Sequence, residues 1–579
     1  MKLFFPFIRW LPELGRPGVW RADVVAGLTV ATILVPQAMA YAELAGLPPV
    51  YGLYAAFLPP AVAALFGSSR HLSTGPVAIA SLISATTVQG LAPEGSELYI
   101  AYSLALGLLV GLIRIAMGAL RLGLLIDLLA SPVVVGFTNA AAFIIAISQL
   151  HKVFGVEPQQ GGHLLAALRV IDVALLEVHW PTMGMAVLAG GLLVVLRRGR
   201  WKLPSMLTTL VVTTLVSWLA GFSGEVVGEI PRGLPRPLVP DLDVEILSQL
   251  FVGALTLTML GLMEAMAIAK TLAARTRQHL DINQELIGQG MANVVGGLFQ
   301  SYATSGSFSR SAVNYQSGAR TGFASVVASL VIAATLLWLT PLLYYLPQAT
   351  LAVVIIAAVV GLVRIQPLVT AWRIKAHDGL IGAATFVGTL VLAPDLHLGV
   401  ALGVGASLVL NFYRTMRPRV VFLARHLDGT MRESDAGLKP DQQIAIMRFD
   451  GQLYFGSGRY FEDKVLETIA SAPELRYLIL DADGINRIDA SGEQALRNVV
   501  ERLREVGLDL YFTRAKRQLT DALERSGLME QIGRDHFFRW NQHALDHLWA
   551  RLHPDYKARC PLNVPHSQES EDGEIEYYI

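Results

Sequence analysis

The sequence predicts a polytopic α-helical membrane protein with fourteen spans, arranged as two inverted repeats of seven and followed by a small α/β domain. Of the 579 residues, 53% are hydrophobic and only 16% are charged, whereas soluble proteins have roughly 25% charged residues. The charged residues are also unevenly distributed: 49 lie in the 163 residues from 417 to 579, against 43 in the first 416. A chain divided in this way is a membrane domain followed by a soluble one.

Each half of the membrane domain contains seven apolar stretches, since about 20 apolar residues cross a bilayer and fewer suffice where protein shields the helix. In the first half (23–222) they lie near 23–43, 50–66, 76–90, 98–119, 126–147, 181–197 and 203–221. In the second half (247–416) they lie near 247–269, 284–300, 309–319, 322–346, 348–363, 378–394 and 396–415. An odd number of spans inverts the second repeat relative to the first, which is the usual architecture of secondary transporters.

The loop charges agree with this topology, because cytoplasmic loops are enriched in Lys and Arg. If residues 1–22 are a cytoplasmic N-terminal segment, the loops on that side contain basic residues such as Arg121, Arg197, Lys270, Arg320 and Lys375. Four loops on the opposite side contain no Lys or Arg: Gly46–Val50, Gly90–Glu97, Leu346–Gln348 and Pro394–Leu396. We therefore expect both termini in the cytoplasm.

Two matching segments, interrupted by Gly and Pro, open the third span of each half. His71–Ser81 reads HLSTGPVAIAS, and Tyr302–Ala312 reads YATSGSFSRSA. Such a pair marks the substrate site in inverted-repeat transporters. The N-terminus of each short helix has unpaired N–H groups and about half a positive charge, and Arg310 adds a full charge. We expect an anion site here, with hydroxyl donors from Ser73, Thr74, Ser307 and Ser309; the alternative is that these small residues only cap and pack the helices.

Two carboxylates lie in predicted spans. Glu264, in the eighth, is the candidate proton-coupling group, because burial favours the neutral form of a carboxyl group and protonation would remove a negative charge when an anion enters nearby. Its alternative role is a structural partner of Arg310. Glu43 lies near the outer end of the first span and is expected to be solvated or hydrogen-bonded. Gln37 and Tyr41 are one helical turn apart and can face the same cavity, although helix packing alone would also explain them.

Several classes of protein are excluded. The single cysteine, Cys560, excludes a disulfide framework, a cysteine-ligated zinc site and an iron–sulfur cluster. The balance of 46 basic and 46 acidic residues gives no indication of a nucleic-acid partner. The sequence has no phosphate-binding Gly-Lys-Ser/Thr loop, metal-ligand cluster or nucleophile elbow. We expect a protein that is not an enzyme, needs no cofactor or metal, and takes its energy from an ion gradient.

Beyond Arg417 the periodicity changes, and residues 440–555 are expected to form a small α/β domain. The predicted strands are Ile444–Phe449, Tyr477–Ala482 and Leu508–Phe512, and the predicted helices are 490–506 and 517–526. Residues 556–579 are expected to form a disordered tail, acidic from Glu569 to Tyr578.

The chain resembles the SulP family of anion transporters, the sulfate permeases, over nearly its whole length. Five segments together carry the resemblance: DVVAGLTV from Asp23, VPQAMAYAELAGLPPVYGLY from Val35, GSSRHLSTGP from Gly67, NQELIGQG from Asn283 and TSGSFSRSAVN from Thr304. It implies a seven-plus-seven fold like that of the nucleobase symporters, in which a core domain (spans 1–4 and 8–11) moves against a gate domain (spans 5–7 and 12–14) in an elevator-like cycle. It also implies an anion site between the half-helices of spans 3 and 10, at Gln37, Tyr41, Val77, Phe308, Ser309 and Arg310, with Glu264 as the acidic residue of span 8.

The resemblance also suggests a substrate. The residue at the position of Val77 is aromatic in some members, so the smaller side chain implies a roomier site. Plant and bacterial sulfate permeases with an acid at the Glu264 position resemble proton symporters, and the stretch SGSFSRS resembles their pattern. We therefore expect proton-coupled sulfate uptake in the cell membrane, specifically a bacterial inner membrane, with membrane lipid around the spans. The alternatives are a sodium-coupled bicarbonate transporter, a dicarboxylate transporter and an uncoupled anion channel.

The C-terminal domain resembles the STAS domain, the anti-anti-sigma-like module that ends SulP transporters, through LDADGINRIDASG from Leu480. Ser491 occupies the position that is phosphorylated in soluble relatives, which makes it a candidate regulatory phosphosite. The favoured alternative is that Ser491, followed by Gln494, is a capping box that begins the helix. The family also implies a homodimer to which the STAS domain contributes.

Overall fold

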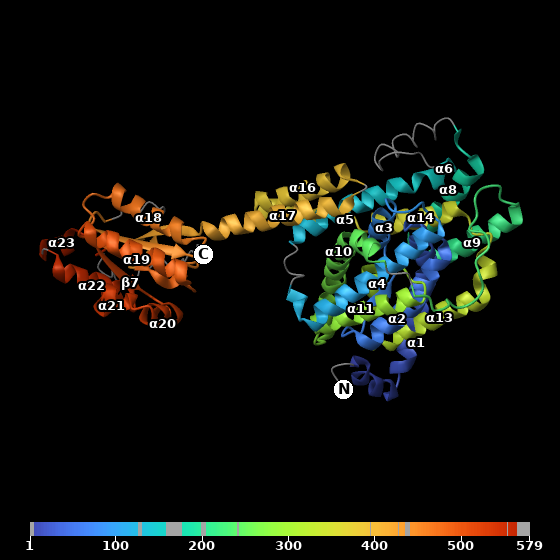
Figure 1. The fold of residues 1–579 in the computed structure, drawn as a ribbon, viewed down its shortest axis with the longest axis horizontal. Helices are drawn as coiled ribbons and strands as arrows, with labels where there is room; N and C mark the ends of the chain where they lie inside the picture. Colours follow the sequence, from blue (N-terminus) through green and yellow to red (C-terminus); the bar gives the residue numbers. More distant parts are fainter. Residues whose placement is uncertain are drawn as a thin grey trace. The chain divides into compact units, whose positions relative to one another are not determined.

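The computed structural model describes residues 5–124, 130–157, 177–198, 204–239, 243–393, 395–426, 428–434, 441–552 and 554–563. The chain divides into two compact units, Met1–Ser407 and Leu408–Ile579, each with its own hydrophobic core. The first unit is helical and the second is an α/β domain (Figure 1).

A helix lies at each of the fourteen stretches that the sequence predicted as spans. The first half contains α1 (Val19–Leu44), α2 (Pro49–Phe66), α3 (Ala78–Val88), α4 (Glu97–Ala119), α5 (Ser131–Ser148), the short α6 (Leu150–Phe154), α8 (Trp180–Arg198) and α9 (Ser205–Ala220). The second half contains α10 (Val244–Thr276), α11 (Ile282–Leu298), α12 (Phe308–Gln316), α13 (Phe323–Ala334), α14 (Gln348–Val360), α15 (Gln366–Ile374), α16 (Ala376–Val391) and α17 (Leu396–Met416). Among the described residues, eight helices are long and apolar enough to cross a membrane, and four more are apolar but shorter.

The helices of the first unit form two packed groups. Helices α1, α2, α3, α4, α10, α11, α12 and α13 pack against one another, and α5, α8, α9, α14 and α16 form the other group. In the first group α4 and α11 approach closely through glycine: a Cβ added to Gly290 would lie 2.8 Å from the Gly111 carbonyl oxygen. Small residues allow such backbone contact between membrane helices. The two groups correspond to the expected core and gate.

A two-stranded antiparallel sheet joins the two halves of the first unit. Strand β1 (Ser73–Gly75) precedes α3, and strand β2 (Ser305–Ser307) precedes α12. The register pairs Ser73 with Ser307 and Gly75 with Ser305. Non-helical backbone is tolerated at membrane depth only where its N–H and C=O groups find partners inside the protein. The pairing of β1 with β2 supplies those partners, which explains why both irregular segments can interrupt a membrane domain.

The second unit is built around a six-stranded sheet with the strand order β4-β3-β5-β6-β7-β8. Strands β3 (Arg419–Arg425), β4 (Met431–Glu433) and β5 (Ile444–Asp450) pair antiparallel around β3, and β5, β6 (Tyr477–Asp481), β7 (Asp509–Thr513) and β8 (Phe537–Phe538) are parallel. The helices are α18 (Gly458–Ser471), α19 (Ala490–Glu505), α20 (Arg517–Arg525), α21 (Leu528–Ile532), α22 (Asn541–Arg551) and α23 (Pro554–Arg559).

Alternate residues of each strand cover the two faces of this sheet. Met447 and Phe449 of β5 lie in the core formed with α18 to α21, and Ile444 and Ile446 lie in the core formed with α22. This period of two is what predicts strands in the sequence. All three predicted strands and both predicted helices are present. Strands β3 and β4 were not predicted, and they precede residue 440, where we expected the domain to begin.

The C-terminal boundary also differs from the expectation. We expected a disordered tail from residue 556, but Cys560 and Leu562 are buried in the core beside α22. The Cys560 thiol donates to Asp441 Oδ2 at 3.1 Å, and Tyr556 Oη donates to Asp441 Oδ1 at 2.6 Å. Burial raises the pKa of the Cys560 thiol to about 11, so it is protonated at neutral pH. The acidic stretch from Glu569 to Tyr578 lies outside the described residues.

The predicted capping box at Ser491 is wrong. Helix α19 is capped by Asp489, whose side chain accepts from Gly492 N at 2.8 Å. Asp489 Oδ2 also accepts from Phe455 N at 3.1 Å, which fixes the cap against the preceding loop. Asp489 has the extended backbone of an N-cap residue (φ −103°, ψ −180°), whereas Ser491 already lies inside the helix. Ser491 is an exposed residue of the first turn, so its role as a phosphosite stays a prediction.

Candidate functional site

A cavity of about 230 Å³ lies at the N-terminal ends of α3 and α12. Its walls include six residues predicted for the anion site, together with the predicted proton-coupling acid: Gln37, Tyr41, Val77, Ser307, Phe308, Ser309 and Glu264. The first helix group supplies these side chains. The second group supplies the facing wall: Arg197, Met206, Ala357, Ala358, Gly361, Leu362 and Arg364. The cavity therefore lies between the two groups of helices.

Both half-helices present backbone donors to this cavity. Helix α3 follows Val77, which has extended backbone angles (φ −139°, ψ 147°) and offers no side-chain cap. Its first intrahelical bond is donated by Ser81 N to Val77 O at 2.9 Å, so the N–H groups before Ser81 have no intrahelical partner. Helix α12 follows Ser307, whose hydroxyl accepts from Arg310 N at the long distance of 3.5 Å. Two such ends together carry about one positive charge from their dipoles.

Arg310 lies behind the cavity wall, and its side chain is completely buried. Its Nη1 donates to Pro76 O at 2.9 Å and to Gln37 Oε1 at 3.4 Å. Among the described residues, Nε and Nη2 have no hydrogen-bond partner. The guanidinium group therefore adds positive potential from beneath β1, whereas the sequence predicted that it would line the site.

Gly75 makes room for this buried guanidinium. Its φ of +148° is a conformation that side chains rarely adopt. A Cβ at this position would lie 3.2 Å from Arg310 Nη2. Glycine at the end of β1 is thus required for two reasons, its backbone angle and its close approach to Arg310.

The predicted hydroxyl donors are divided between two roles. Thr74 is fully buried, and its hydroxyl accepts from Gln289 Nε2 at 2.7 Å. Ser73 N donates to Ser311 Oγ at 2.8 Å, which ties β1 to α12. Ser307 and Ser309 line the cavity, with their hydroxyl oxygens 3.4 Å apart. The structure therefore places the hydroxyls of the second half at the cavity and uses those of the first half for packing.

Glu264, on α10, lines this cavity and an adjoining one of about 250 Å³. Within the described ranges no hydrogen bond or ion pair is found for its carboxylate. The alternative role as the ion-pair partner of Arg310 is not observed, because Arg310 donates to Pro76 and Gln37 instead. Glu43 is ion-paired with Lys152, with 2.9 Å between Oε2 and Nζ, as expected for a hydrogen-bonded terminus.

Three arginines at or near the site were not predicted as functional residues: Arg114, Arg197 and Arg364. The Arg364 guanidinium lies over the ring of Phe308, 5.0 Å from its centroid, and its backbone is held by Asn139 of α5 through bonds of 2.7 and 3.0 Å. Arg114 of α4 is buried and donates to Thr304 O at 2.8 Å, which fixes the chain entering β2. A charge inside the apolar span 98–119 is a signal that could have identified Arg114. Arg364 was read from the sequence only as a loop charge.

Within the described part of the chain, no group of three or more His, Cys, Asp or Glu residues could hold a metal ion. The donors at the cavity are backbone N–H groups, hydroxyls, an amide, a phenol and guanidinium groups. Such a set suits a small anion.

The fold and this cavity define a polytopic helical membrane transporter. Residues 20–385 match the model of the sulfate permease family, and residues 438–543 match that of the STAS domain. The chain therefore belongs to the sulfate permease family, as its motifs predicted. It is a family of transporters, which confirms that the protein is not an enzyme.

Two plant relatives cover most of the chain. Sulfate transporter 4.1, chloroplastic, of Arabidopsis thaliana is 35% identical over 92% of this chain and 81% of its own length. High affinity sulfate transporter 1 of Stylosanthes hamata is 31% identical over 93% of this chain and 85% of its own length. Neither supports the bacterial inner membrane that we expected from the sequence.

Two solved structures have a similar fold. Murine Solute Carrier 26 family member A9, an anion transporter in the inward-facing state, aligns with a TM-score of 0.86 and 25% identity over 94% of both chains. The transmembrane domain of the cyanobacterium bicarbonate transporter BicA aligns with a TM-score of 0.58 and 26% identity, over 68% of this chain and 98% of that chain. The expected membrane fold with a C-terminal STAS domain is confirmed.

Proposed function

We propose that this protein takes up sulfate together with a proton by secondary active transport. The observation that carries the proposal is the cavity at which two uncapped or weakly capped helix N-termini meet, with the Arg310 guanidinium buried behind them. A small dianion accepts several N–H bonds at such helix ends without a full ion pair. The names of the plant relatives favour sulfate.

Glu264 is the proposed proton carrier. Its carboxylate lines the cavity and lacks a cationic hydrogen-bond partner in the described structure, so its charge can be neutralised by a proton without breaking a salt bridge. A proton on Glu264 would offset one negative charge of the entering dianion, because like charges in a poorly hydrated site repel one another.

The proposed movement follows from the two sides of the cavity. Gln37, Val77 and Ser309 belong to the core group, and Met206 and Ala358 belong to the gate group. Sliding of the core past the gate would carry the anion across the membrane while its N–H donors stay attached to it. The gate wall offers mainly apolar atoms at Met206, Ala357, Ala358 and Leu362, which suits a surface that slides.

The test is uptake of radiolabelled sulfate into proteoliposomes, with an inward proton gradient imposed and then collapsed. We expect accumulation only while the gradient is present. The Glu264→Gln variant should exchange internal for external sulfate at a near-normal rate but lose gradient-driven accumulation. Unchanged accumulation by that variant would contradict the role of Glu264, and no sulfate flux in the wild type would contradict the substrate.

Bicarbonate is the second candidate substrate, because the membrane domain resembles that of a bicarbonate transporter. The same vesicles supplied with bicarbonate and sodium, and then with fumarate, separate these alternatives. Sulfate flux that equilibrates but never accumulates would instead indicate an uncoupled channel.

We also propose a homodimer in the cell membrane with both termini in the cytoplasm and a contribution from the STAS domain. Mass measurement of the purified full chain in nanodiscs should give two protomers for each particle. A mass of one protomer would contradict the dimer and leave the transport proposal intact.

A further inference from the structure

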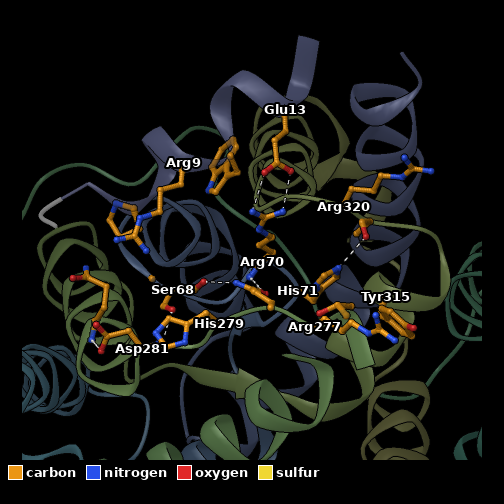
Figure 2. A pocket seen from close by; sticks show the side chains of 17 residues that line it. Arg9, Glu13, Ser68, Arg70, His71, Arg277, His279, Asp281, Tyr315 and Arg320 are labelled. Carbon is orange, nitrogen blue, oxygen red and sulfur yellow. Dashed lines mark hydrogen bonds and ion pairs between the residues drawn. The ribbon is translucent and has the colours of Figure 1, made fainter. Parts of the chain in front are cut away.

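A second cavity in the first unit has a different chemistry. It has a volume of about 560 Å³, within the range of small-molecule sites. Four segments of the chain converge on it: the N-terminal segment at Arg9, the loop after α2 at Arg70, the end of α10 at Arg277, and the turn before α13 at Arg320. Figure 2 shows these side chains around the pocket, with Glu13 facing Arg70. It shares no lining residue with the cavity at the half-helices.

The charges of this pocket do not balance. Its two carboxylates, Glu13 and Asp281, already have partners: Glu13 accepts two bonds of 2.9 Å from Arg70, and Asp281 caps α11 by accepting from Asn283 N and Gln284 N. In contrast, no ion pair or side-chain hydrogen bond is found for Arg9, Arg277 or Arg320 in the described chain. Three guanidinium groups around one cavity therefore have no ion-pair partner in the described chain, and the four lining arginines exceed the two lining carboxylates by two charges.

The backbone around the pocket is held in place. Arg277 has a left-handed φ of 53°, an uncommon conformation for a residue with a side chain. Gln278 Nε2 donates to Ser68 O at 2.7 Å, which joins the end of α10 to the loop after α2. His71 Nε2 donates to Ala319 O at 3.0 Å, which joins that loop to the turn before α13. The left-handed Arg277 is the residue that ends α10, and the loops that carry Arg70, Arg277 and Arg320 are held together in a fixed frame.

The frame leads directly to the half-helices. Glu285 of α11 accepts from Ser68 N and Ser69 N at 2.7 Å each, and Gln289, one turn later, donates to both Glu285 and Thr74 of β1. Asn314 of α12 donates to His71 O at 3.2 Å. A ligand that holds the loop after α2 would therefore also restrain β1.

We propose that this pocket binds an anion that bears two or more phosphate charges. Arginine forks match phosphate oxygens in geometry and charge, and an excess of two positive charges around 560 Å³ is more than a single monovalent ion neutralises. The phosphate group can come from a soluble diphosphate compound or from the headgroup of an anionic lipid. The proposal does not depend on which anion the protein transports.

The test is calorimetric titration of inorganic pyrophosphate into the full-length protein in phosphatidylcholine nanodiscs, with saturating sulfate present. We expect one binding event per chain. Arg277→Gln and Arg320→Gln should each weaken it about tenfold, since each removes a charge-assisted contact. Arg373→Gln, which removes an exposed arginine of α15 away from the pocket, should have no effect. The unfolding temperature of each variant reports that the frame is intact.

Failure of pyrophosphate to bind, or binding that both pocket substitutions leave unchanged, would overturn the proposal. A second titration in nanodiscs that contain cardiolipin, whose headgroup carries two phosphates, identifies the source of the phosphate. If a lipid headgroup occupies the pocket, the apparent affinity for pyrophosphate falls for the wild type and for Arg373→Gln but much less for Arg277→Gln. Equal affinities in the two kinds of nanodisc indicate a soluble ligand.

Discussion

The two half-helices occupy matching places in the two repeats, yet they supply different chemistry. The first, after β1, begins with Val77, Ala78 and Ile79 and has no side-chain cap. The second, after β2, begins with a capping serine and carries Ser309 and Arg310 in its first turn. One repeat thus offers bare backbone donors, and the other offers charge and hydroxyls. An inverted repeat preserves the backbone arrangement while each copy specialises its side chains.

The largest loss of sulfate affinity is expected when the positive charge of the second half-helix is removed. Arg310→Gln should weaken sulfate binding by about 100-fold, because it removes the buried positive potential behind the cavity and the charged bonds to Pro76 O and Gln37 Oε1, each worth roughly 1.5–3 kcal/mol. Equilibrium sulfate binding to the purified protein measures this. Arg373→Gln removes an arginine of the same unit that lies on α15, outside the cavity, and should bind normally. Wild-type affinity in Arg310→Gln would show that the charge is not what the second repeat contributes.

A smaller effect is expected from β1 of the first repeat. Gly75→Ala introduces a Cβ 3.2 Å from Arg310 Nη2 at a φ of +148°, so either the guanidinium or β1 must shift. We expect about tenfold slower uptake and a lower unfolding temperature, from a strain of about 1–3 kcal/mol. Gly184→Ala is the matched control, because a Cβ there meets nothing within 4 Å. Equal behaviour of the two variants would mean that the glycine of β1 is dispensable.

The smallest effect comes from making the two N-termini alike. Val77→Ser would give α3 a capping hydroxyl like that of Ser307, which should stabilise the helix by about 1 kcal/mol. The same hydroxyl would compete with the anion for a backbone N–H, so sulfate affinity should fall by about three- to fivefold. Ser307→Ala tests the reverse change in α12, with a small loss of stability. Thermal unfolding measures the change in stability, and sulfate titration measures the change in affinity. Tighter binding by Val77→Ser would contradict the role of uncapped donors.

The sequence predicts the spans well because apolar length is a local property. It also predicts the half-helices from their Ser, Thr and Gly residues, since helix interruptions are local too. The pairing of Ser73 with Ser307 was not predicted, because three-residue strands far apart in the chain carry no periodic signal. Helix α15 was missed for a related reason: its nine residues are too short and too amphipathic to count as a span.

Side-chain roles were harder to predict than positions. The sequence around Arg310 predicted that its side chain would line the site. Only the fold shows that it lies behind β1 and donates to Pro76 and Gln37. Arg364 reaches Phe308 through a loop whose conformation depends on Asn139, more than two hundred residues earlier. Contacts of this kind are set by tertiary packing, which a single sequence does not encode in its local pattern.

The sheet formed by β1 and β2 has a consequence for how such a chain can be divided. Each repeat contributes one strand and leaves the hydrogen-bonding edge of that strand to be completed by the other. A fragment that ends between the repeats would carry an open strand edge inside the membrane, where no water can satisfy it. Neither repeat can therefore mature alone. Two separately synthesised halves would have to associate before either became a stable membrane protein. The two repeats therefore fold as one unit and have to be produced together.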